Sequence, residues 1–534
     1  MRSVETVLAL VVLATVVAAF AKRLRIPAPS LLVIAGLVVG LLPGVPPVRV
    51  TPNLVSLVVL PPLLYAASEE LPWRDLRDVW RQVAVLAVGL VLASAGAVAL
   101  VAVAVAPLTA TMAFVLGAVL ASTDPVAVTA LARRLSLPSR LQALVQAESL
   151  FNDATSLVLF RIAVTLAVAG TAAHAPAGTR WLQGIGQFVA LAGGGAITGG
   201  AIAAGVVLVR RRISDPVLET VVALVTPYAA YVLAETLRVS GVTAVIVAGL
   251  IIGAQLQRVT NPQTRLQLHS VYQTVIFLLE SVVFSLIGLE LPTLIRALSR
   301  TGQQWPLEAL AITGTLIATR VLWVFPLSAI AAWRRGARRP SWQVPAVVSW
   351  AGARGVVPLA AALSIPLTTG TSPAGSPLPG RDLVLVLATA VIAISLIVQG
   401  FTLEPLVRFA GISRAPADTR HEATVARLRL AEAGLARLDE LADTEAAPDV
   451  VIDRLRRNLQ TQINSTRARI KESQEGPDPE STGTADRDIR RDLIAVENAE
   501  LNRLYESGTI SDTTRRRLQR SLDLEATGLG DEHH

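Results

Sequence analysis

The sequence contains no cysteine, which excludes disulfides, thiolate metal ligands and a cysteine nucleophile. It has only five histidines, and none stands beside a second ligand type at metal-binding spacing within an apolar run. Aromatic residues make up 4% of the chain and charged residues 16%, whereas hydrophobic residues make up 52%. The mean hydropathy is +0.54. These values are typical of a protein that crosses a lipid bilayer many times.

Thirteen apolar runs are long enough to cross a bilayer as helices. They cover residues 4–21, 27–42, 53–67, 82–106, 109–131, 142–168, 182–209, 215–236, 241–257, 270–291, 306–332, 343–366 and 383–408. Connections on one side hold 18 Arg and Lys residues, and those on the other side hold 7. By the positive-inside rule the N-terminus is outside and the chain after Arg408 is cytoplasmic. The predicted fold is all-α and polytopic, in the cell's inner (plasma) membrane.

The composition changes after Arg408. Residues 1–408 carry a formal charge of +13, whereas residues 409–534 carry −5. We therefore predict a transmembrane domain over residues 1–410 and a helical cytoplasmic tail over 411–534, with a possible regulatory role. Its helices are expected at 421–443, 449–472 and 486–525, with a flexible linker at about 472–485. The basic excess lies mostly in short connections, so it indicates orientation and not nucleic-acid binding. Nothing in the tail suggests catalysis, and we expect no enzyme activity.

Two of the runs carry breaks in helical hydrogen bonding. The fifth contains Ala121-Ser-Thr-Asp-Pro125, and the twelfth contains Ala351-Gly-Ala-Arg-Gly-Val-Val-Pro358. Proline or paired glycines at membrane depth free backbone groups to face a cavity. The two runs are seven apart, so they cross the membrane in opposite directions. Discontinuous helices in oppositely oriented halves mark the binding site of inverted-repeat transporters, and we predict such a pair here.

Six charged residues lie near the middle of their runs: Asp124, Glu148, Asp153, Glu280, Arg320 and Arg354. Charges at this depth are costly and are tolerated when paired. We predict structural ion pairs of Glu148 with Arg354 and of Glu280 with Arg320. Arg161 lies about 12 Å beyond Asp153 along the same helix, where its long side chain is expected to reach the membrane interface.

Asp124 and Asp153 are then left without fixed partners. An unpaired buried carboxylate must bind either a proton or a cation. If one site holds a hard cation or a proton but not both, and opens alternately to each side, inward proton flow drives outward cation flow. The oxygen ligands available suit sodium or lithium, and the site contains no soft ligand. No cofactor is implied.

Four pieces of the sequence occur in the order of a known family: Leu60-Pro-Pro-Leu-Leu-Tyr65, Ser122-Thr-Asp-Pro125, Glu148-Ser-Leu-Phe-Asn-Asp153 and Gly352-Ala-Arg-Gly355. In them the chain resembles the bacterial sodium/proton antiporters of the cation/proton antiporter-1 family. The resemblance implies thirteen spans, homodimers, and a core domain that moves against a dimerisation domain. It also implies that Glu148 and Arg354 form a structural ion pair.

The same resemblance assigns roles within the site. It makes Asp153 the carboxylate shared by cation and proton, with Thr123, Asp124, Ser149 and Asn152 around it. The order Asn152-Asp153 resembles members that exchange one cation for one proton. Many relatives place Glu directly after the aromatic residue of the first motif, where this chain has Ala66. Any role of that Glu is absent here, or has moved to Glu69 or Glu70.

Two other classes of function use buried acids. A cation channel needs a continuous pore and usually a selectivity loop, and the sequence offers no candidate loop. A proton-coupled transporter of another small solute favours aromatic residues at its site, and the chain has few. Monovalent cation/proton antiport remains the primary prediction, with sodium, lithium and potassium all open as the cation.

Overall fold

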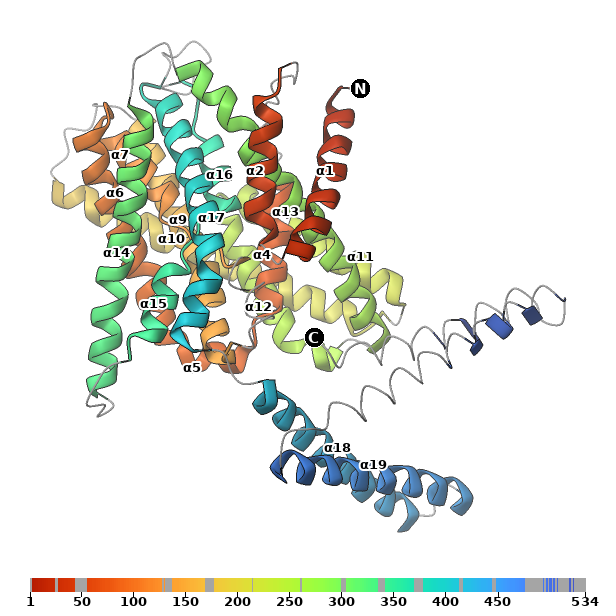
Figure 1. Ribbon diagram of the computed structural model, residues 1–534. Coiled ribbons are helices and arrows are strands. Elements are labelled where there is room, and N and C mark those ends of the chain that lie inside the picture. Colours follow the sequence, from red (N-terminus) through yellow and green to blue (C-terminus); the bar gives the residue numbers. More distant parts are fainter. Residues whose placement is uncertain are drawn as a thin grey trace. The chain divides into compact units, whose positions relative to one another are not determined.

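The computed structural model describes residues 2–24, 27–43, 55–126, 129, 137–168, 177–213, 215–259, 262–298, 304–334, 341–368, 378–412, 416–443 and 448–475, with isolated positions between 493 and 522. Every extended regular element in these ranges is helical (Figure 1). The all-α prediction is confirmed.

The helices follow the predicted apolar runs closely. They are α1 (Arg2–Leu24), α2 (Ala28–Leu41), η1 (Val55–Val59), α4 (Leu60–Glu69), α5 (Trp73–Ala84), η2 (Val85–Leu90), α6 (Val91–Val105), α7 (Ala110–Leu120), α9 (Ser139–Val168), α10 (Ala177–Arg210), α11 (Pro216–Thr236), α12 (Gly241–Val259), α13 (Pro262–Leu298), α14 (Trp305–Arg334), α15 (Gln343–Trp350), α16 (Val356–Leu363) and α17 (Arg381–Ala410). Within the described residues, seven helical stretches are long and apolar enough to span a bilayer, and five shorter apolar helices accompany them. The total of thirteen spans stays a prediction.

One predicted connection is itself a helix. We expected a loop between the third and fourth runs, but its residues form α5, which leads through the π-helical η2 into α6. Leu76, Val79 and Val83 are buried along one face of α5, whereas Trp73 and Trp80 are exposed. This spacing of three and four residues is the pattern of an amphipathic helix, so the sequence did contain the signal.

The membrane helices form two bundles. In the first, which we call the flanking bundle, α2 packs on α13, and α12 packs on α10, α4 and α11 (Figure 1). In the second, the site bundle, α7 packs on α6 and α9, and α14 packs on α6, α15 and α17. The bundles meet where α17 contacts α13 and α2, and where α9 contacts α10.

Close backbone approach holds the flanking bundle together. A Cβ atom added to Gly36 of α2 would lie 2.1 Å from the carbonyl oxygen of Ser285 on α13. One added to Gly288 of α13 would lie 2.1 Å from the carbonyl oxygen of Val33 on α2. Small residues let helix backbones meet closely, which is how helices associate when the surrounding lipid is as apolar as they are.

The tail is a separate compact unit. One unit runs through the membrane helices as far as Ser413, and another contains the tail from Arg414. In the tail, α18 (Pro416–Asp443) packs on α19 (Asp449–Glu475), and Arg456 bridges to Asp439 across the pair at 2.8 Å. These helices coincide with the first two predicted there. Helix α19 runs to Glu475, a few residues into the predicted linker. The rest of that linker and most of the third predicted helix lie outside the described residues.

Candidate ion site

The fifth and twelfth runs are both interrupted near their middle. Helix α7 stops at Leu120, and residues 122–125 are not helical. Pro125 explains this break, because proline has no N–H to donate and disfavours a helical conformation in the residue before it. In the twelfth run, residues 351–355 separate α15 from α16. Both predicted interruptions are therefore present.

The two interruptions touch each other. The backbone N–H of Asp124 donates a hydrogen bond of 2.7 Å to the carbonyl oxygen of Ala353. A Cβ atom on Gly355 would lie 1.6 Å from Oδ2 of Asp124, so a larger residue does not fit at this position. The Asp124 carboxylate also accepts a hydrogen bond of 2.9 Å from the N–H of Val126, which holds the side chain in place.

Helix α9 presents Asp153 to the first interruption. The Asp153 side chain is 7% exposed and accepts a hydrogen bond from the hydroxyl group of Ser122. Ser156, one turn later, donates to the carbonyl oxygen of Ala118 at 2.6 Å and fixes α9 against α7. Within the described part of the chain, no basic side chain forms an ion pair with Asp153. Asp124 is the neighbouring acid whose charge acts on it.

Asn152 and Ser149 hold Thr123 in place. The side-chain amide of Asn152 accepts from the N–H of Thr123 at 3.3 Å and donates to its hydroxyl oxygen at 2.6 Å. The hydroxyl groups of Thr123 and Ser149 are 3.2 Å apart. The structure thus gathers the five residues predicted for ion and proton binding at one place. Their carboxylate and hydroxyl oxygens are the hard ligands that alkali cations prefer.

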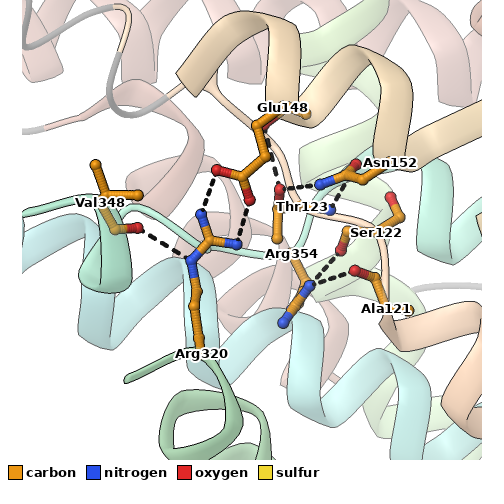
Figure 2. Close-up of polar contacts among 9 residues, drawn as sticks. Ala121, Ser122, Thr123, Glu148, Asn152, Arg320, Val348 and Arg354 are labelled. Atoms are coloured by element: carbon orange, nitrogen blue, oxygen red, sulfur yellow. Dashed lines mark hydrogen bonds and ion pairs between the residues drawn. The ribbon is translucent and has the colours of Figure 1, made fainter. Parts of the chain in front are cut away.

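Glu148 pairs with Arg320, not with Arg354 as we predicted (Figure 2). Nη1 of Arg320 lies 2.6 Å from Oε1 of Glu148, and Nη2 donates to Oε2 at 2.9 Å. Nε of Arg320 donates to the carbonyl oxygen of Val348 at 3.0 Å. Arg320 thus contacts both oxygens of the Glu148 carboxylate, and hydrogen bonds between charged groups are stronger than those between neutral ones. The predicted pair of Glu280 with Arg320 is consequently wrong as well.

Arg354 instead binds the end of α7. Its Nη1 donates to the carbonyl oxygens of Ala121 and Ser122 at 3.0 and 2.6 Å (Figure 2). These carbonyls lie where the helix ends, so they lack the partners that a continuous helix supplies. A cation at a helix C-terminus is also favoured by the helix dipole. The interruption therefore leaves these two carbonyl groups available to accept hydrogen bonds from Arg354, which does not pair with Glu148.

Comparison with known proteins identifies the family. Residues 9–409 match the family described as sodium/hydrogen exchanger, transmembrane. The chain belongs to this family. It is 34% identical over 542 residues to an uncharacterized Na+/H+ exchanger of Mycobacterium tuberculosis, covering 98% of this chain and 96% of that protein. It is 33% identical over 417 residues to a Na+/H+ antiporter of Aphanothece halophytica, covering 78% and 76%.

A solved structure of the sodium proton antiporter MjNhaP1 from Methanocaldococcus jannaschii at pH 8 has the same fold as this exchanger-family chain. The TM-score is 0.60 at 20% identity, and the match covers 76% of this chain and 98% of that one. At this identity the likeness establishes the arrangement of helices. It agrees with an all-helical membrane domain over most of the first unit.

Glu280 occupies the other bundle of the exchanger. It lies on α13, which packs on α2 in the flanking bundle, whereas Arg320 lies on α14 in the site bundle. The described residues include no ion-pair partner for Glu280. Asp124 and Glu70 are the acidic groups whose charge reaches it. Glu280 is therefore close enough to Asp124 for the charges to interact, and no arginine among the described residues neutralises it.

The position where many relatives have Glu holds the buried Ala66. Glu69, one of the two residues considered as its replacement, accepts a hydrogen bond of 3.4 Å from the Tyr65 hydroxyl and interacts with Arg210 of α10. Glu70 is exposed. Glu69 thus has partners of its own within the flanking bundle.

From the sequence we assigned no role to Ser122 and did not predict the contact between Arg161 and Glu235. Ser122 lies in a recognised motif, and its place directly before Thr123 was the available signal. Arg161 forms an ion pair with Glu235 of α11, and both side chains are about one-third exposed. The reach of Arg161 to the membrane interface stays a prediction. No local pattern connects residues on α9 and α11, so this contact could not be predicted from the sequence.

Proposed function

We propose that this chain exchanges a monovalent cation for a proton across the membrane, with both ions competing for Asp153. Family membership supports secondary-active cation/proton antiport, and the mechanism is our proposal. One observation carries it: Asp153 is a buried carboxylate whose described partner is a hydroxyl group, Ser122, and its neighbouring charge is another acid, Asp124. Such a carboxylate is stabilised only by binding a proton or a cation.

The surrounding oxygens would receive the cation. Carboxylate oxygens of Asp153 and Asp124, together with the hydroxyl groups of Thr123 and Ser149, provide a hard ligand set. When a cation binds, the Ser122 hydroxyl group gives up its hydrogen bond to Asp153 and lies beside the cation instead. When a proton binds instead, the carboxyl group becomes neutral and the cation loses its main ligand. Asn152 is proposed to hold Thr123 in position both when a cation is bound and when a proton is bound.

Transport also requires the site to open to each side in turn. We propose that the site bundle moves against the flanking bundle and carries Asp153 between the two sides. One cation is proposed to be exchanged for one proton, because the order Asn152-Asp153 resembles that of members with this stoichiometry. The protein would act as a homodimer in the inner membrane, with its N-terminus outside and its tail in the cytoplasm, and it would move ions instead of converting a substrate.

The cation is proposed to be sodium, with lithium or potassium as alternatives. The Aphanothece relative is named a Na+/H+ antiporter, and a Bacillus subtilis relative is named a sodium, potassium, lithium and rubidium/H+ antiporter. Dequenching of a pH-sensitive dye in everted vesicles, on adding each cation separately, tests the proposal. Cation-dependent proton movement supports antiport. Cation flux that persists without an opposing proton gradient would indicate a channel.

A further inference from the structure

A small cavity lies beside Arg354, between α14, the 351–355 segment and α17. Its volume is about 10 Å³, which is room for one water molecule. Its walls are formed by Thr313, Leu316, Ile317, Arg320, Gly352, Arg354, Ser395 and Gln399. Five of these residues have polar side chains, which is enough to give one water molecule the two to four hydrogen-bond partners that a buried water needs.

One residue on the wall of this cavity, Gln399, lacks a hydrogen bond that it should make. Gln399 of α17 is 5% exposed, and its Oε1 atom is fully buried and has no hydrogen-bond partner among the described residues. Nη1 of Arg354 makes both of the side-chain hydrogen bonds described for that residue. The rest of its guanidinium group points away from the two carbonyls (Figure 2). Buried polar groups are rarely left unpaired in native structures.

We propose that one water molecule occupies this cavity, accepting a hydrogen bond from Arg354 and donating one to Oε1 of Gln399. The hydroxyl oxygen of Thr313 donates to Ala309 and keeps a lone pair that can accept the second proton of the water. The water then makes three hydrogen bonds, the usual number for a buried water.

Gln399 is thereby a positioning residue for the ion site, an inference that builds on the proposed role of Asp153. The water orients the Arg354 guanidinium, which holds the carbonyl oxygen of Ser122 at 2.6 Å. The hydroxyl group of the same Ser122 donates to Asp153. A change at Gln399 therefore reaches Asp153 through Arg354 and Ser122 without any direct contact.

Transport kinetics test this role. Gln399→Met keeps the size of the side chain and removes its hydrogen-bonding groups, so we expect the KM for the cation to change about fivefold, as the loss of one hydrogen bond allows, with a shifted pH profile. Thr389→Val is the matched control, because Thr389 lies on the same helix, is fully buried and has an unpaired hydroxyl group, but does not line the cavity.

An unchanged KM and pH profile in Gln399→Met, or the same change in Thr389→Val, would overturn the positioning role. The water is tested separately in the full-length wild-type protein, by electron cryomicroscopy at a resolution that shows ordered water. A density peak within hydrogen-bond distance of Arg354 and Gln399 supports the proposal, and an empty cavity overturns it. The map does not depend on transport, so its outcome is distinct from any failure of the antiport mechanism.

Discussion

Glu148 and Arg320 form a bidentate ion pair between α9 and α14, with 1% and 3% of their side chains exposed. Two charges in such a place are tolerated because each neutralises the other. If one is removed, the other is left buried without a partner, which typically costs about 3–5 kcal/mol.

We predict that Glu148→Leu and Arg320→Met each lower the thermal unfolding temperature of the purified protein strongly. The double variant should lose less stability than the two single variants added together, since it leaves no buried charge. The exposed pair Glu404 and Arg408 on α17 is the control, and its neutralisation should change stability by less than about 1 kcal/mol. Additive effects at Glu148 and Arg320 would contradict the ion pair.

Asp153→Asn should abolish cation-dependent proton movement while the protein still inserts and folds. Asparagine keeps the size of the side chain and can still accept the Ser122 hydrogen bond, but it neither takes up a proton nor carries a negative charge for the cation. The dye assay in everted vesicles measures this. Asp382→Asn, at a largely exposed acid at the start of α17, is the control and should exchange normally. Exchange at the wild-type rate by Asp153→Asn would contradict the proposed mechanism.

Gly355→Ala should strongly reduce exchange. The new methyl group would lie 1.6 Å from the Asp124 carboxylate, whose backbone is held by Ala353, so the two interruptions must separate. Gly314→Ala on α14 has open space around its Cβ and should leave the exchange rate unchanged. Comparing the initial rates of the two variants at equal protein amounts is the measurement. Equal activity of the two would show that the crossing tolerates a side chain.

Cross-linking the two bundles should stop exchange reversibly. The chain has no cysteine, so a Cys pair introduced at Arg161 and Glu235 is the only target for a reducible bis-thiosulfonate reagent. A direct disulfide is too short for positions that two long side chains join. The control places Cys at Tyr272 and Ala223, which are in contact within the flanking bundle. If transport continues in the cross-linked Arg161 and Glu235 variant, the bundles do not move apart at that contact.

A chain that ends at Ser413 should still exchange ions, with a changed rate or pH profile. All of the predicted site residues lie in the first compact unit, before that point. The tail carries −5 and the membrane domain +13, and attraction between exposed charges is weak and screened by salt. Proteoliposomes containing equal amounts of the short and full-length chains provide the comparison. Complete inactivity of a properly inserted short chain would contradict a purely modulatory tail.

The interruptions of the fifth and twelfth runs were predictable because Pro125 and the glycines around Arg354 act locally on the backbone. The depth of a residue in the membrane could also be predicted, since it follows from position along a helix. The direction in which a side chain points around its helix could not be predicted. Glu148, Arg320 and Arg354 all lie at similar depth, and the choice of partner depends on which helices are neighbours.

Contacts between distant helices escaped prediction for the same reason. Arg161 and Glu235 lie on helices from different bundles, and nothing near either residue indicates the other. The helical character of α5 is hard to predict for a different reason. Its three arginines are typical of a connection between membrane spans, although Leu76, Val79 and Val83 repeat with helical spacing.

The hydrogen bond from Asp124 to Ala353 has a mechanical consequence. Each interrupted segment has given up helical hydrogen bonds and would be compliant if it stood alone. Because this hydrogen bond joins them, each segment restricts the movement of the other, and together they connect α7 to α16. When a cation binds and displaces one segment, the other segment is expected to move with it. We therefore expect the site bundle to respond to its ions as a stiff body, with the deformation concentrated where it slides along the flanking bundle.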